Sequence, residues 1–151
     1  MIGLSRAPRL DGWEERLIAA LSGHASRPFE WGGRRGGSDC HMLAMDCVMA
    51  VVGVDPYPDE RGRYSTRIGA LRLFRKRGFA WLTDAYDAVF DRVPASLARR
   101  GDIGLVEVMD PEGARVACAC VVAGADAWGK GPQGTVRVPT LSLSVVWKVG
   151  A

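Results

Sequence analysis

The spacing of apolar residues changes once along the chain, near Val93. Before this point apolar residues recur three and four positions apart, which predicts helices, and after it the spacing is strand-like. No internal repeat or long linker divides the sequence, so we expect residues 1–151 to form one domain. Consecutive strands with short turns pair antiparallel. The pattern therefore predicts an α+β fold, with N-terminal helices packed on a C-terminal antiparallel sheet.

Four helices are expected in the first part of the chain. Asp11 and Glu14 have the spacing of a capping box, which predicts a first helix that starts at Asp11 and ends near Gly23. A second helix is expected at about residues 40–52 with Asp39 as its N-cap. Its apolar residues run almost all round, which predicts a central, buried helix.

The third helix is expected at about residues 66–77, with Ile68, Leu71 and Phe74 as its buried stripe. A short fourth helix is expected around residues 83–90. The strand-like segments that follow are 103–109, 115–123, 126–128, 135–138 and 143–149. A hairpin turn at 110–113 joins the first two, and a glycine loop at 129–134 precedes the fourth.

Composition narrows the class of protein. The chain is 48% hydrophobic and 25% charged, which is typical of a globular domain. Its 20 basic and 17 acidic residues leave a net charge of +3, too mild a balance to indicate nucleic-acid binding. Neither a membrane-spanning apolar stretch nor a signal peptide is recognisable, so we expect no membrane insertion. We expect synthesis and retention in a bacterial host cytoplasm, unless a larger assembly carries the chain out.

One local charge excess stands out, because seven basic residues fall between Arg61 and Arg77. A solvated helix face accounts for such a run without any function. That is the simpler interpretation; the functional alternative is a docking surface for an acidic partner, with Arg72 and Arg75 as the candidate contacts.

The four cysteines are Cys40, Cys47, Cys118 and Cys120. Cys40 and Cys47 form one close pair in the sequence, and Cys118 and Cys120 form another. Neither pair has a standard zinc-site spacing, so we expect no metal and no cofactor. Cys47, Cys118 and Cys120 have the pattern of small buried hydrophobes.

Cys40 differs from the other three because a glycine-containing loop leads it to the start of a predicted helix. Unpaired backbone N–H groups and the helix dipole there favour an anion, so we expect a lowered thiol pKa. That position suits a cysteine nucleophile, although a cysteine that only packs is the other interpretation.

The residues around Cys40 resemble the signature of the NlpC/P60 cysteine-peptidase superfamily. The resemblance spans about residues 28–138 and is closest to an uncharacterised group from phage and prophage tail gene clusters. Its motifs are Pro28-Phe29-x-Trp31-Gly32-Gly33, Asp39-Cys40, Gly53-x-Asp55-Pro56, Arg61-Gly62-Arg63-Tyr64, Arg99-Arg100-Gly101-Asp102 and Gly131-Pro132-x-Gly134. The resemblance implies a papain-like fold with Cys40 in the position of the nucleophile.

The histidine that this family uses as the base is missing. Its expected place is near residues 115–117, yet the only histidines are His24 and His41. His41 is about 100° round the helix from Cys40, so their side chains diverge. His24 remains as a candidate base, which would have to fold back from the preceding loop. Asp126 falls near the third, orienting position but has no histidine to orient.

Three functions remain open on this basis. The first is a structural protein of a phage or phage-like tail, located at the tip or hub and built on a catalytically degenerate scaffold. Its partners would be other tail proteins, and it would reside in the virion. The second is an active cysteine peptidase or amidase that cleaves cell-wall peptides, with His24 or a partner chain as base. The third is a non-catalytic module that holds a cell-wall peptide. The candidate binding residues are Trp31, Gly32, Gly33, Asp39 and Trp128, and the candidate groove also includes Asp126.

Overall fold

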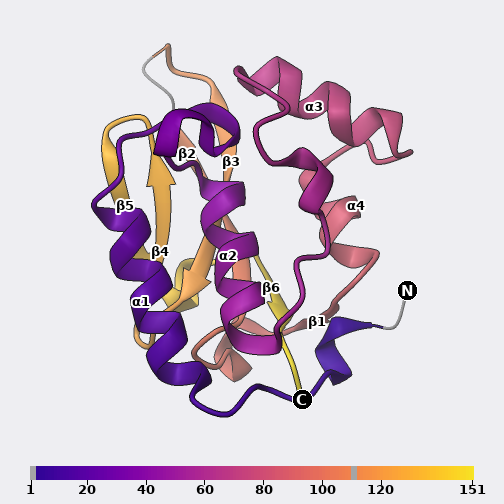
Figure 1. Ribbon diagram of the computed structural model, residues 1–151, viewed down its shortest axis with the longest axis vertical. Coiled ribbons are helices and arrows are strands. Elements are labelled where there is room, and N and C mark those ends of the chain that lie inside the picture. The colour runs from indigo at the N-terminus through magenta and orange to yellow at the C-terminus, as the bar shows by residue number, and fades with distance from the viewer. Residues whose placement is uncertain (1–2, 110–111) are drawn as a thin grey trace.

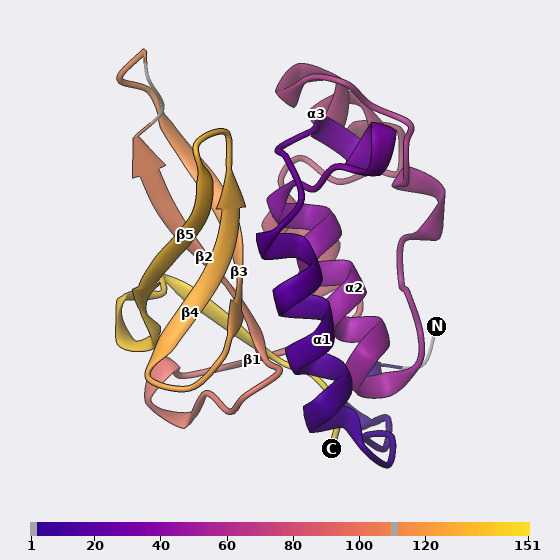
Figure 2. The same cartoon turned by 60° about the vertical axis from the view of Figure 1, so that its left-hand side comes forward.

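The computed structural model describes residues 3–109 and 112–151, and these form two layers. One layer is a six-stranded sheet with the order β1-β6-β2-β3-β4-β5, in which every paired neighbour runs antiparallel. The other layer holds helices that cover one face of the sheet (Figures 1 and 2). The expected α+β class is confirmed. Residues 110–111 of the expected hairpin turn lie outside the described residues.

The α-helices are α1 (Trp13–Ala25), α2 (Cys40–Val52), α3 (Arg67–Lys76) and α4 (Leu82–Asp87). The strands are β1 (Asp91–Val93), β2 (Ile103–Met109), β3 (Arg115–Val122), β4 (Asp126–Gly131), β5 (Gly134–Pro139) and β6 (Val145–Lys148). Short 3-10 turns are η1 (Leu4–Arg6), η2 (Trp31–Gly36), η3 (Pro58–Glu60), η4 (Ala95–Leu97) and η5 (Thr140–Ser142).

Helix α2 is the centre of the helical layer, as its apolar sequence predicts. It packs on α1 on one side and on β3 and β4 on the other, and ten of its thirteen residues are buried. Asp39 caps it, because the carboxylate accepts a hydrogen bond from the N–H of Met42 at 2.8 Å. Gly53 ends it in the left-handed conformation, at φ +79°.

The expected limits of the first helix are wrong at both ends. Asp11 does not cap α1; the N-cap is Gly12 at φ +73°, and no side chain bonds there. A left-handed residue turns the chain into the helix, and in this case a glycine supplies that turn. At the other end α1 continues through Gly23 to Ala25, because a lysine from the sheet satisfies its last carbonyls (below).

The expected buried stripe of α3 is only partly correct. Phe74 is buried, but the side chain of Ile68 is 63% exposed and Leu71 is half-buried. Helix α3 lies at the margin of the helical layer rather than over the sheet (Figure 1), so only one turn of its apolar side meets the core. This leaves an apolar residue on an otherwise basic surface.

The expected glycine loop at 129–134 is mostly strand. Residues 129–131 belong to β4, and Gly131 pairs with Gly134 across a two-residue turn. Gly129 lies in the strand for a steric reason. A Cβ at this position would lie 3.0 Å and 3.1 Å from the sulfur atoms of Cys118 and Cys120. The glycine therefore accommodates two neighbouring thiols rather than a turn.

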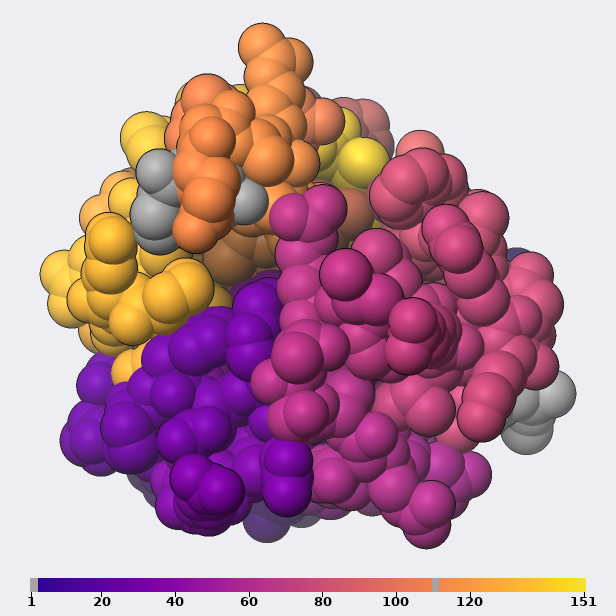
Figure 3. Space-filling model, turned by 90° about the horizontal axis from the view of Figure 1, so that it is seen from above, coloured from indigo at the N-terminus to yellow at the C-terminus, as the bar shows by residue number. Residues whose placement is uncertain are grey.

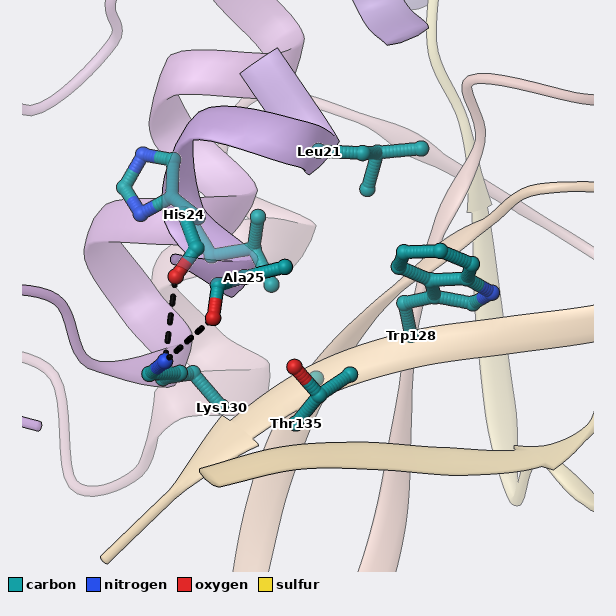
Figure 4. A pocket seen from close by; sticks show the side chains of 8 residues that line it. Leu21, His24, Ala25, Trp128, Lys130 and Thr135 are labelled. Carbon is teal, nitrogen blue, oxygen red and sulfur yellow. Dashed lines mark hydrogen bonds between the residues drawn. The ribbon is translucent and has the colours of Figure 1, made fainter. Parts of the chain in front are cut away.

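A buried lysine connects the two layers. The side chain of Lys130 on β4 is almost fully buried, and its ammonium donates to the carbonyls of His24 at 3.0 Å, Ala25 at 3.4 Å and Arg27 at 2.5 Å. Figure 4 shows this ammonium beneath the end of α1. A cation at a helix C-terminus satisfies free carbonyls and also interacts favourably with the helix dipole.

Replacement of Lys130 by Met should lower the free energy of unfolding by about 2–4 kcal/mol, because buried carbonyls lose a charged donor. Urea unfolding monitored by circular dichroism measures this change. The matched control is Lys76→Met on the exposed side of α3, which should have little effect. Equal midpoints for the two variants would contradict the assignment of Lys130 as the link between layers.

Candidate active site

The candidate site lies at the N-terminal end of α2, where Cys40 is the first helical residue. The carboxylate of Asp39, which is 1% exposed, organises this end. One oxygen caps the helix, while the other accepts from the N–H of Gly32 at 2.7 Å and from the hydroxyl of Tyr64 at 2.5 Å. Asp39 thus fixes η2, α2 and the segment after η3 in one cluster.

Gly32 is required for this close packing. Its φ is +74°, and a Cβ there would lie 2.6 Å from the carbonyl oxygen of Tyr64. The glycines that the sequence marked as candidate binding residues, Gly32 and Gly33, therefore serve the fold of the loop over α2.

Cys118 on β3 faces Cys40. Cys40 packs against the buried cluster that contains Cys118 and Cys120. The thiol of Cys118 donates to the carbonyl of Ala119 at 3.6 Å, and that of Cys120 to the carbonyl of Cys118 at 3.8 Å. The sulfur of Cys118 thus lies against Cys40, only one position beyond the region where the family resemblance requires a histidine. Figure 3 shows this end of the molecule, where the orange atoms of β2 and β3 and the magenta atoms of the segment around α3 adjoin at the surface.

The pKa of Cys40 is raised well above its ordinary value, which corrects the expectation of a lowered pKa. The thiol of Cys118 is the largest cause, followed by burial, and the charge of Asp39 adds to both. Contact with Cys120 and burial raise the pKa of Cys118 itself to about 12. The N-cap carboxylate opposes the helix N-terminus that was expected to favour a thiolate. Cys40 is therefore a neutral thiol.

His24 does not serve Cys40. It is buried near the end of α1, where its Nδ1 lies 2.6 Å from the hydroxyl of Ser38 and its Nε2 lies 2.6 Å from Asp46. Asp46 is about 240° round α2 from Cys40, so its partner His24 lies on the other side of the helix. Both ring nitrogens of His24 are engaged, so this candidate base has a structural role.

His41 also points away from the thiol, as its place on the helix predicts. Its Nδ1 lies 2.8 Å from the hydroxyl of Tyr86, and its Nε2 lies 3.9 Å from Glu60. Burial is the main reason that the pKa of His41 falls to about 4. An imidazole with so low a pKa is a poor acceptor for a thiol proton near neutral pH.

The remaining candidate residues, Asp126, Trp128 and Trp31, have contacts of their own. Asp126 is exposed at the first position of β4, where it pairs with Pro139. Trp128 lies beside Leu21 at the α1–β4 junction (Figure 4), and the guanidinium of Arg137 stacks 4.1 Å from its ring centroid. Trp31 packs edge-on against Phe29 with ring centroids 5.0 Å apart.

Several residues at the site escaped the sequence analysis. Cys118 was interpreted only as a buried hydrophobe, although its position next to the expected histidine region is a signal. Tyr64 was part of a quoted motif but had no assigned role. His24 bonds to Ser38 and Asp46, and no local sequence pattern indicates these two contacts. They depend on the packing of α1, η2 and α2.

A second polar cluster lies beside the site, around the buried carboxyl of Glu60. This side chain is 1% exposed, and neither carboxyl oxygen has a hydrogen-bond partner. The carboxyl lies near the neutral imidazole of His41 and near the guanidinium of Arg77, whose Nη2 lies 3.3 Å from Oε2. Burial is the main reason that the pKa of Glu60 rises from 4.5 to about 7.

The pH dependence of stability follows from these two shifted pKa values. Between pH 4.5 and 7 the folded state holds a proton on Glu60 that the unfolded state releases, so this group lowers stability as pH rises. His41 acts oppositely between about 4 and 6.5, because the unfolded chain binds the proton there. The two contributions offset each other over their shared range.

Replacement of Glu60 by Gln removes the contribution of Glu60 to the pH dependence of stability and leaves that of His41. Relative to the parent chain, the variant should gain stability as pH rises from 4.5 through about 7, on the order of 2 kcal/mol in total. Urea unfolding across that range measures the difference. Glu107→Gln on the exposed part of β2 is the control, and a difference that does not change with pH would contradict a raised Glu60 pKa.

Two further observations concern metal sites and membrane-spanning helices among the described residues. Over residues 3–109 and 112–151, no group of three or more His, Cys, Asp or Glu side chains has an arrangement that could hold a metal ion. Within the same ranges, no helix is both long enough and apolar enough to cross a membrane.

Comparison with known proteins places the chain in one family. No curated protein and no solved structure matches it. One family profile matches residues 8–149, which is nearly the whole chain. The protein belongs to the family described as "Domain of unknown function (DUF6950)".

Proposed function

We propose that this chain is a non-catalytic structural component of a phage or phage-like tail, associated with the tip or hub and present in the virion. The tail assignment rests on the resemblance of its ordered motifs to the tail-cluster group of the NlpC/P60 superfamily. The absence of catalysis rests on the site. A cysteine peptidase needs a thiolate and an acid for the leaving group, and Cys40 faces the neutral thiol of Cys118 instead.

The contact between Cys40 and Cys118 is the observation that carries this proposal. A thiol partner with a pKa of about 12 can neither accept the proton of Cys40 nor protonate an amine at useful rates. Both histidines of the chain are engaged elsewhere, with Asp46 and with Tyr86. The scaffold around the thiol, held by Asp39, remains intact as a rigid unit for assembly.

Helix α3 supports the interaction role. Arg72 and Arg75 are exposed on it, and helical geometry places both on the same side as the exposed Ile68. In Figure 3 the atoms of α3 lie at the surface of the molecule, in the pink-magenta region of the view. A basic surface with an apolar residue at its centre suits an acidic, partly apolar surface of a neighbouring tail protein.

Replacement of Cys40 by Ala tests the non-catalytic role. The variant should be incorporated into particles as well as the parent chain, and neither protein should release peptides from purified peptidoglycan. Quantitative mass spectrometry of particles and chromatography of the digests measure both. Asp39→Ala is the structural control and should reduce incorporation, because the helix cap and loop anchor are lost. Turnover by the parent chain that disappears in Cys40→Ala would overturn the proposal.

Charge reversal on α3 tests the docking surface. The double variant Arg72→Glu/Arg75→Glu should lower incorporation by roughly tenfold or more, since like charges then face the acidic partner. The control is Arg6→Glu/Arg115→Glu, which makes the same charge change at exposed residues elsewhere. If both double variants are incorporated as the parent is, α3 is only a solvated surface.

A further inference from the structure

A cavity lies on the side of α2 that faces away from Cys40, and neither the proposed function nor the thiol site uses it. Its volume is about 200 Å³, room for several water molecules or a small ligand head group. The polar and charged side chains in its wall are His24, Arg27, Asp46 and Arg61. Glycines of the η2 segment, with Gly62, form much of the rest.

The guanidinium of Arg61 is held rigidly in this wall. Its Nε donates to Asp55 at 2.7 Å, and its Nη2 forms an ion pair with Asp46. Although burial opposes the charge, these two carboxylates raise the pKa of Arg61 above its ordinary value. Nη2 is buried, and its contact with Asp46 is an ion pair without regular hydrogen-bond geometry. These contacts use Nε and Nη2 of a group that has five N–H donors, so a fixed guanidinium with further donors borders the cavity.

The acceptors of the wall are already engaged. One carboxylate oxygen of Asp46 lies 2.6 Å from Nε2 of His24, and the other forms the ion pair with Arg61. Burial alone would raise the pKa of Asp46, but these partners outweigh it and lower that pKa, so the carboxylate stays ionised. Backbone donors are engaged too, since the N–H groups of Gly33 and Gly62 bond to carbonyls within the loops.

Arg27 supplies the second guanidinium at the mouth of the cavity. Its side chain is 43% exposed, and its Nη1 lies 3.9 Å from Asp46 and 3.4 Å from Nε2 of His24. Each guanidinium has five N–H donors, and the contacts of Arg27 and Arg61 engage only some of them. The unused hydrogen-bonding capacity of this wall is therefore that of cationic donors.

We propose that this cavity binds an oxyanion, a carboxylate or phosphate group, between Arg27 and Arg61. Planar guanidinium groups match the geometry of both anions and form charge-assisted hydrogen bonds with them. The ion pairs with Asp46 and Asp55 hold one guanidinium in place before the ligand arrives, which reduces the ordering cost of binding. The site is independent of Cys40 and of α3.

Titration of the full chain with succinate and, separately, with inorganic phosphate tests the site, at constant ionic strength and near neutral pH. Amide and arginine side-chain NMR signals of Arg27, Arg61 and Gly62 should shift in a saturable way, with a millimolar Kd for at least one probe. The probe that saturates at the lower concentration identifies the preferred oxyanion. Lack of saturable shifts with either probe would overturn the proposal.

Two substitutions at Arg27 and one nearby control make the test specific. Arg27→Gln should weaken binding by roughly tenfold, and Arg27→Lys, which keeps the charge but not the planar fork, should weaken it less. Arg34→Gln makes the same charge change at an exposed residue of η2 that does not line the cavity, and it should leave the Kd unchanged. Equal weakening by Arg27→Gln and Arg34→Gln would show only general charge attraction and would refute the site.

Discussion

The buried carboxylate of Asp39 is the interaction on which this site depends. It caps α2 through Met42, holds the loop through Gly32 and orients Tyr64, so three separate segments meet at one charged group. Hydrogen bonds to a buried charge are the stronger kind, and this one is fully enclosed. The same negative charge lies next to Cys40 and disfavours a thiolate there. One residue thus holds together the segments around Cys40 and at the same time disfavours a thiolate there.

The two sides of α2 have separate roles as a result. On the sheet side, Cys40 meets the thiols of β3 in a close-packed environment where the pKa values of Cys40 and Cys118 are raised. On the opposite side, Asp46 joins α1 to the segment after η3 through His24 and Arg61, around a polar cavity. The network around Asp46 leaves guanidinium N–H donors of Arg27 and Arg61 without partners in the wall. A search for ligands is therefore better directed to this side than to the thiol.

Local sequence patterns predict much of the fold. The Asp39 cap, the Gly53 end of α2 and the limits of β2 are as expected, because each rests on a local rule of capping or alternation. Failures occur where a distant partner decides. Helix α1 passes Gly23 because Lys130, more than a hundred residues later, satisfies its end, and Gly129 lies in a strand because two thiols adjoin it. Nothing near Gly23 or Gly129 in the sequence carries this information.

The place of Cys40 at the start of α2 was predictable from the sequence, but its ionisation was not. Cys40 does begin α2, yet its pKa depends on the residue opposite, and the pairing of α2 with Cys118 is a tertiary fact. The roles of His24 and His41 were likewise set by buried partners on other segments, such as Tyr86. A motif gives the identity of a nucleophile position, whereas the proton chemistry depends on neighbours that no short spacing fixes.

The ionisation of the Cys40 thiol tests the central claim most directly. Alkylation of this residue by iodoacetamide can be followed by mass spectrometry of its peptide, in the folded chain, from mildly acidic to alkaline pH. The account predicts slow alkylation near neutral pH that rises only under alkaline conditions, without a step in the range where an imidazole titrates. Fast alkylation near neutral pH, with an inflection near about 6.5, would show a base-assisted thiolate and contradict the account.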